Sequence, residues 1–315
     1  MINGVRDSSG YPFVSVLTPL IRFACVTQKI VTNSPTLGAR PKCHQKTNNR
    51  QLTTNNFSYF STYLKSMMLL RYLSQIGKYF LMWKEIFNKP TKWSVMRSLI
   101  FKEIDDLIIG SLGIVAFISF FVGGVVAIQT ALNLTNPLIP KYLIGFATRQ
   151  SVILEFAPTF ISIIMAGKMG SFITSSIGTM RVTEQIDALE VMGVNSLNYL
   201  VFPKLIALQL YPFVIGISMF LGIFGGWVAA VYGGFGSSDE FIGGLQQDFI
   251  PFHIAYAFIK TFVFALLLAT IPSFHGYYMK GGALEVGKAS TVSFVWTSVM
   301  IIAMNYILTQ MLLTQ

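Results

Sequence analysis

Charged residues are scarce in this sequence, at 11% of 315 residues, while apolar residues make up 53% and the mean hydropathy is +0.60. Soluble domains carry about one-quarter charged residues, so the composition excludes an ordinary water-soluble fold for most of the chain. The shortage is uneven: residues 103–315 hold 8 Lys/Arg and 11 Asp/Glu, whereas residues 1–102 hold 15 Lys/Arg and two acids. The net charge of +10 therefore belongs to the amino end. A basic flank before a first membrane span follows the positive-inside rule, and no nucleic-acid partner is expected.

Cysteine and histidine are also nearly absent. Cys25 and Cys43 both lie near the amino end, and His44, His253 and His275 are widely separated. This excludes a disulfide, a redox pair or a zinc site in the apolar part of the chain. The chain also lacks a Gly-x-x-x-x-Gly-Lys-[Ser/Thr] loop, so we expect no cofactor of its own, and any ATP must be bound by another chain.

The first 66 residues differ from the rest. They are rich in Ser, Thr, Asn and basic residues, contain one acid (Asp7) and show no sustained apolar periodicity. We expect a disordered extension in residues 1–66 and a membrane domain in residues 67–315. Two explanations of the extension stay open: an organellar transit peptide, or a translation that begins upstream of a true start at Met67 or Met68.

The remainder predicts an all-α membrane protein. Apolar residues at helical spacing in 68–87, with bases between them, predict an amphipathic helix in the membrane interface. Five later segments are long and apolar enough to cross a bilayer. They are residues 107–132, 144–167, 205–238 with a Gly-rich end, 254–271 and 292–313.

The charges between spans predict the orientation. With the amino end inside, the 233–252 loop lies outside and carries three acids and no Lys or Arg. Lys280 and Lys288 then lie inside, as do Lys168, Arg181 and Lys204. The asymmetry favours five spans, with the amino end inside and the carboxyl end outside.

The polar segment between spans two and three predicts a short helix at 183–192. Thr183 is a candidate N-cap, and Gly193 a candidate stop. Val182, Ile186 and Leu189 fall on one face, and the acids Glu184, Asp187 and Glu190 fall on others. Two interpretations stay open on spacing alone: a docking helix for another protein, or a surface helix that joins two spans.

Several motifs resemble, in order, those of the MlaE family of permeases, and the resemblance covers about residues 68–315. The Glu-Gln-Ile-Asp-Ala-Leu run with the matching order of spans on both sides makes it specific. The motifs are Glu155-Phe-Ala-Pro158, Ala166-Gly-Lys-Met-Gly-Ser171, Ile177-Gly-Thr-Met-Arg-Val-Thr-Glu-Gln-Ile-Asp-Ala-Leu189, Met192-Gly193, Tyr199-Leu-Val-Phe-Pro203 and Gly281-Gly-Ala-Leu-Glu-Val-Gly-Lys-Ala289.

The resemblance implies the permease subunit of an ABC transporter that moves phospholipid between membranes. It implies a homodimer, two ABC ATPase subunits and an MCE-domain lipid-binding partner. The loop helix at 183–192 would be the coupling helix, so the resemblance assigns ATPase contacts to Glu184, Gln185, Ile186, Asp187, Ala188 and Leu189. The family serves bacterial inner membranes and the plastid inner envelope, and the motifs here favour the bacterial membrane.

Three positions depart from the family pattern. Leu154 stands where many members have Arg, and Ser176 where they have Glu. Lys168 replaces an Arg, which keeps the charge but not the planar bidentate fork. A headgroup contact through an Arg at position 154 is therefore not carried over.

Glu155 and Lys260 are the ionisable residues deepest in apolar segments. A charge there is costly unless it is paired or faces a polar cavity, so the two residues are predicted to lie in the lipid path. The other interpretation is a structural ion pair or an outward-snorkelling lysine. Small residues at Gly123-Gly124 and Gly222-x-x-x-Gly226 permit close helix approach, for which packing within the chain is favoured over a dimer seam.

Two other function classes remain as alternatives. An intramembrane enzyme using Glu155 lacks a second carboxylate in a span and any His-Glu-x-x-His or Gly-x-Ser-x-Gly motif, so no catalytic or metal-binding residue is assigned. An ion or proton-coupled carrier would have one Glu and one Lys as its relay. The sequence favours a permease that is not itself an enzyme.

Overall fold

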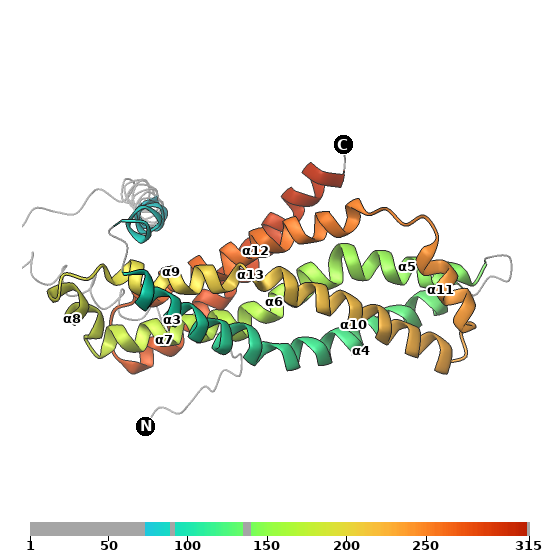
Figure 1. The fold of residues 1–315 in the computed structure, drawn as a ribbon, viewed down its shortest axis with the longest axis horizontal. Helices are drawn as coiled ribbons and strands as arrows, with labels where there is room; N and C mark the ends of the chain where they lie inside the picture. Colours follow the sequence, from blue (N-terminus) through green and yellow to red (C-terminus); the bar gives the residue numbers. More distant parts are fainter. Residues whose placement is uncertain (1–72, 89–91, 135–139, 314–315) are drawn as a thin grey trace, which may run out of the picture. The chain divides into compact units, whose positions relative to one another are not determined.

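The computed structural model describes residues 73–88, 92–134 and 140–313, and these form helices joined by short turns. The predicted extension at residues 1–66, with both cysteines, lies outside the described residues, so its nature stays a prediction. Five helices are long and apolar enough to cross a membrane, which confirms the five predicted spans (Figure 1). They run over Trp93–Asn133, Tyr142–Val182, Ser196–Tyr232, Phe252–Tyr277 and Ala283–Leu312.

Each spanning helix begins or ends beyond its predicted apolar window. The first joins α3 (Trp93–Glu103), the π-helical η1 (Ile104–Ile109) and α4 (Gly110–Asn133) without a break. The third consists of α9 (Ser196–Leu208) and α10 (Tyr211–Tyr232), so it begins nine residues before the predicted start at 205. Helices extend past the hydrocarbon because their own hydrogen bonds satisfy the backbone in both lipid and water.

The second span changes helix type four times. It runs through α5 (Tyr142–Ser151), η2 (Val152–Phe160), α6 (Ile161–Met165), η3 (Ala166–Gly170) and α7 (Ser171–Val182). Pro158 lies inside η2, where it withdraws one backbone donor from the helix. Wide turns of this type occur often at functional sites, and this one contains Glu155.

The connection between spans three and four begins at the predicted Gly-rich end and contains a further helix. Gly233 ends α10 and Gly234 has φ +74°, as the Gly-rich end of span three predicted. Ser237 and Glu240 form a capping box that starts α11 (Ser238–Gln246). The chain then continues through α12 (Phe252–Tyr277) and α13 (Ala283–Leu313).

Spans one and three pack through glycines. A Cβ at Gly123 would lie 1.8 Å from the carbonyl oxygen of Gly222, and one at Gly225 would lie 2.0 Å from that of Phe120. Beside this contact, the Ser119 and Ser218 hydroxyls form a buried hydrogen bond of 2.7 Å. The predicted role of these small residues in packing within the chain is confirmed, because α4 and α10 meet backbone to backbone.

Substituting Gly123 with alanine is expected to separate α4 from α10 and to lower stability by about 1–3 kcal/mol, since backbone atoms rather than a flexible side chain obstruct the added methyl. Gly113→Ala on the same helix is the matched control, because nothing lies within 4 Å of its Cβ position. Thermal unfolding of the two detergent-solubilised variants checks this. Equal melting temperatures would contradict the close packing.

The helix at residues 73–86 corresponds to the predicted interfacial helix. Met82 and Ile86 are fully buried against the rest of the domain, and the Tyr79 hydroxyl lies 2.6 Å from the Thr270 hydroxyl on α12. Most residues of the apolar stripe predicted from the sequence are exposed on the side of the helix away from the domain, as is expected of residues that face lipid. Its exposed members are Leu73, Ile76, Phe80 and Phe87.

Candidate functional site

A polar cluster joins spans two, four and five around Glu155 and Lys260. Lys260 Nζ on α12 donates to Glu155 Oε1 at 2.9 Å. The same ammonium donates to the Leu154 carbonyl at 3.1 Å and lies 4.7 Å from the centre of the Tyr256 ring. The sequence raised but did not decide whether the two charges meet, and the structure shows that they do.

The Leu154 carbonyl belongs to the π-helical turn that contains Pro158. It accepts a hydrogen bond from the buried Lys260 ammonium at 3.1 Å. Leu154, where many family members have Arg, therefore contributes its backbone to the cluster.

The other carboxylate oxygen of Glu155 is bound by residues that the sequence analysis did not select. Asn305 Nδ2 on α13 donates to Glu155 Oε2 at 3.1 Å. The Thr159 hydroxyl lies 3.1 Å from that oxygen and 2.9 Å from Asn305 Oδ1. An amide within the apolar run of span five was the available signal, since such a group needs a partner in lipid.

Exposure distinguishes this ion pair from another in the same domain. Lys260 is fully buried, yet the Glu155 side chain is 45% exposed. In the ion pair of Lys204 with Glu103, the side chains are 4% and 17% exposed, so that pair is nearly closed. The Glu155 carboxylate thus presents a charged, partly open surface within a spanning helix, flanked by the exposed rings of Phe156 and Phe160.

A third buried cation was missed by the sequence analysis. Arg149 on α5 is 4% exposed. Its guanidinium donates to the carbonyls of Leu245 and Gln247 at 2.6 and 3.0 Å. These carbonyls lie at the end of α11, where a cation is favoured by the helix dipole, so Arg149 holds α11 against span two.

The loop helix is present as α8 (Gln185–Val191), at the opposite end of the bundle from α11 (Figure 1). The predicted N-cap is wrong: Glu184 occupies that position with φ 59° and makes no side-chain cap, while the Thr183 hydroxyl donates back to the Thr179 carbonyl. Span two continues as helix to Val182, so Thr183 still lies on its last turn. The predicted stop is confirmed, since Gly193 has φ +76°.

The faces of α8 are distributed as predicted, with one consequence for docking. Ile186 is fully buried and Leu189 half-buried, so the apolar face packs on the chain itself. Ile186 therefore positions the helix and is not available to a partner in this structure. A different apolar stripe is exposed: Ala188, Val191 and Met192, of which Val191 is 89% and Met192 68% exposed.

Polar contacts fix α8 to the spans. Arg181 pairs with Asp187 at 2.7 Å. Glu190 Oε1 accepts from the Ser196 and Tyr277 hydroxyls, each at 3.0 Å, and these lie on α9 and α12. These contacts connect α8 to spans two, three and four.

These features define a class: a multi-pass α-helical membrane protein with a half-open ion pair inside its spans and a rigidly attached helix at one end. Among the described residues, no group of three His, Cys, Asp or Glu is placed to hold a metal ion. The family model "Permease MlaE" matches residues 100–311, which includes the ion pair and α8. The chain belongs to the MlaE family of ABC transporter permeases.

Named relatives agree with this assignment. A probable ABC transporter permease protein of Rickettsia bellii (strain RML369-C) is 33% identical over 248 residues, covering 77% of this chain and 93% of the relative. The intermembrane phospholipid transport system permease protein MlaE of Haemophilus influenzae is 26% identical over 256 residues, covering 77% and 97%. Protein TRIGALACTOSYLDIACYLGLYCEROL 1, chloroplastic, of Arabidopsis thaliana is 32% identical over 201 residues, covering 63% and 57%.

Proposed function

We propose that this chain is the non-catalytic permease subunit of an ATP-driven transporter that moves phospholipids between membranes. The family match over residues 100–311 carries the proposal, since it includes both the Glu155–Lys260 ion pair and α8. The Haemophilus relative is named for phospholipid transport, which supports this substrate class here. ATP is bound and hydrolysed by a separate ABC ATPase subunit, and the permease itself holds no cofactor.

In the proposed mechanism, the Glu155–Lys260 cluster lies in the lipid path. Its exposed carboxylate and the adjoining Thr159 and Asn305 groups offer hydrogen bonds to a headgroup, while the flanking aromatic rings contact acyl chains. Because Lys260 is held by Glu155 and by the Leu154 carbonyl, a lipid phosphate would compete with Glu155 for the ammonium. Such exchange would give the site two states, and lipid binding would shift the population between them.

The coupling helix extends over 183–192 and meets the ATPase. Glu184, Gln185, Asp187 and Ala188 face outward, as the assignment requires, and Val191 with Met192 extends this surface. Ile186 and Leu189 contribute indirectly, because they pack the helix against the rest of the domain. Nucleotide-driven motion of the ATPase would reach the lipid path through Glu190 and the long helix of span two.

The complete assembly is expected to contain two copies of this chain, two ATPase subunits and an MCE-domain lipid-binding protein. We place it in the inner membrane of a bacterium; the chloroplastic relative supports the plastid inner envelope as the alternative. The predicted orientation, with the amino end and α8 on the cytoplasmic side, places the coupling helix where ATP is available.

Co-purification tests this function. The full chain, extracted in mild detergent from its own host, is expected to retain an ABC ATPase subunit and to show ATP hydrolysis that depends on that subunit. Reconstitution of the complex should give ATP-dependent transfer of fluorescent phospholipid. A chain that recruits no ATPase would contradict the proposal and favour the carrier or enzyme alternatives that use Glu155.

A further inference from the structure

Two adjoining clefts lie between the helix at 73–86 and the spans α12 and α13. The first, the basic cleft, has a volume of about 340 Å³ and is lined by Lys78, His275, Tyr278, Lys280, Glu285 and Lys288 among others. The second, the apolar slot, has about 460 Å³ and is lined by Ile76, Phe80, Leu267, Ile271, Trp296 and Met300 among others. Both share Gln75, Phe274 and His275, so one continues into the other.

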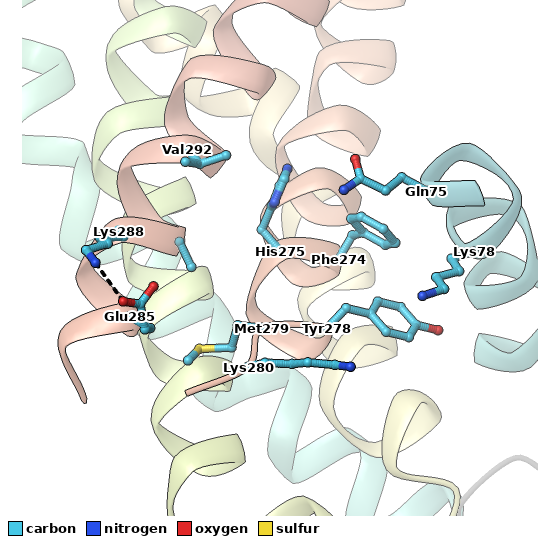
Figure 2. Close-up of a pocket in the computed structure, with 11 residues that line it drawn as sticks. Gln75, Lys78, Phe274, His275, Tyr278, Met279, Lys280, Glu285, Lys288 and Val292 are labelled. Carbon is cyan, nitrogen blue, oxygen red and sulfur yellow. Dashed lines mark hydrogen bonds and ion pairs between the residues drawn. The ribbon is translucent and has the colours of Figure 1, made fainter. Parts of the chain in front are cut away.

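The basic cleft contains two lysines, Lys78 and Lys280, for which the described residues show no ion pair. Figure 2 shows Lys78 pointing from its helix toward the Tyr278 ring and Lys280 extending beneath that ring, with the Glu285–Lys288 pair on the far side. Lys288 donates to Glu285 at 2.6 Å, so these two charges cancel. Within the described part of the chain, neither Lys78 nor Lys280 forms an ion pair.

Tyr278 adds a neutral donor to the cleft. Burial, with a smaller contribution from the Glu85 carboxylate, raises the pKa of its phenol above the ordinary value. The hydroxyl therefore stays protonated and can donate to an anion. Two free ammonium groups beside a phenol are suited to a phosphate.

The two clefts follow one another along α12 and α13. Lys280 lies in the loop that joins these helices and Lys288 near the start of α13, whereas the slot residues of α12 and α13 lie further along both helices. Leu267 is eight residues from His275 on α12, about 12 Å along the axis, and Met300 is twelve residues from Lys288, about 18 Å. These lengths suit acyl chains that descend from a headgroup at the basic cleft.

The helix at 73–86, which forms one wall of both clefts, is anchored to α12 and α9 by hydrogen bonds. Tyr79 bonds to Thr270 at 2.6 Å and packs edge-on against Phe274 with ring centres 5.7 Å apart. Asn198 Nδ2 on α9 donates to the Ile86 carbonyl at 2.7 Å, which fixes the far end of the same helix. The slot is therefore a formed gap between anchored helices.

From this arrangement we propose that the two clefts together form a binding site for one anionic phospholipid of the surrounding bilayer, separate from the transported lipid at Glu155. Its phosphate is bound by Lys78, Lys280 and Tyr278, and its acyl chains occupy the apolar slot. In the predicted orientation the site opens to the cytoplasmic leaflet, where anionic lipids attract basic groups. The bound lipid stabilises the position of the 73–86 helix, whose far end contacts α9 next to the coupling helix.

Native mass spectrometry of the full chain in detergent tests the site by titration with dioleoylphosphatidylglycerol, dioleoylphosphatidylcholine and inorganic phosphate. The anionic lipid is expected to bind more tightly than the zwitterionic one. The double variant Lys78→Ala with Lys280→Ala should weaken it roughly 10- to 30-fold, since each basic group near a membrane surface contributes about fivefold. Lys84→Ala with Lys102→Ala is the matched control, because both lysines are exposed, line neither cleft and carry the same charge.

A second variant separates a formed site from general surface charge. Ile76→Trp fills the slot without altering any charge and should also weaken phosphatidylglycerol binding. Unchanged binding in this variant, or in the lysine double variant, would overturn the proposal. Displacement of the lipid by inorganic phosphate at equal concentration would show a phosphate site instead. ATP-driven transfer in the reconstituted complex tests the transport proposal separately, so failure of this site and failure of the transport proposal are distinguishable.

Discussion

Glu155→Gln is expected to reduce ATP-driven phospholipid transfer at least tenfold while the protein still folds and reaches the membrane. The amide keeps the size of the carboxylate, and its one carbonyl oxygen can still accept a hydrogen bond from Lys260. It removes the negative charge that holds Lys260, so the exchange between carboxylate and lipid phosphate is lost. Transfer by the reconstituted complex, normalised to protein abundance in the membrane, is the measurement.

Removing either partner outright should have a second effect. Glu155→Ala leaves the fully buried Lys260 ammonium without its counter-charge. Loss of one partner costs about 3–5 kcal/mol in a fully buried pair, and the cost here should lie below that range because the Glu155 side chain is 45% exposed. Lys260→Ala leaves a carboxylate that is 45% exposed and still bound by Asn305, so its cost should be smaller. Thermal unfolding should therefore rank Glu155→Ala as the less stable variant.

Glu103→Gln provides the control for a purely structural pair. Glu103 binds Lys204 in a nearly closed contact, so this variant should lower stability and change transfer only in proportion to folded protein. If Glu155→Gln behaved in the same way, with transfer per folded molecule unchanged, the cluster would be a structural ion pair and not part of the lipid path.

Two glutamates at the exposed stripe of α8 are expected to abolish association with the ATPase. Val191 and Met192 are 89% and 68% exposed, so Val191→Glu with Met192→Glu should change the stability of the permease by only about 0.5 kcal/mol per residue. At the centre of an interface, a buried unpaired charge costs several kcal/mol, which corresponds to at least a hundredfold loss of affinity. Pull-down of the ATPase with the tagged permease, followed by ATPase activity, measures this.

Phe249→Glu with Ile250→Glu is the matched control for the α8 variant. This pair is also consecutive, apolar and about half exposed, but it lies between α11 and α12, at the other end of the bundle. ATPase should remain bound to this variant. Retention of the ATPase by the α8 variant as well would contradict the assignment of α8 as the coupling helix.

Much of the fold could be predicted from local sequence. Long uncharged runs predicted the five spans, because a helix is the usual structure in which a single chain segment satisfies its backbone in lipid. Gly193 and the glycines after α10 ended helices as predicted, since these positions adopt or adjoin a left-handed backbone conformation. The outer limits of the spans were not predictable from hydropathy, because helix continues into water wherever its own hydrogen bonds and packing allow.

The candidate site was predicted less completely, because the hydrogen-bond partners of its side chains could not be identified from the sequence. Glu155 and Lys260 stood out because charges are rare in apolar segments. Asn305 did not, although it binds Glu155, since it is uncharged and its partner lies 150 positions away. Thr183 was a plausible cap, but its hydroxyl bonds within the preceding helix because span two extends further than its apolar window.

The sequence by itself determined that the part of the chain the structure describes holds five segments long and apolar enough to cross a membrane. It also determined where the rare charges of these segments lie and that a short amphipathic helix joins spans two and three. The free energy of placing apolar or charged residues in lipid depends on each segment separately, so these features could be predicted without knowing which helices pack against it. Only the tertiary structure decided that Glu155 pairs with Lys260 and stays half open, that α8 buries Ile186 and exposes Val191 and Met192, and that Lys78 shares a cleft with Lys280. These contacts and exposures depend on which faces of the helices pack together. That packing is determined by segments far apart in the sequence and not by the local pattern of residues.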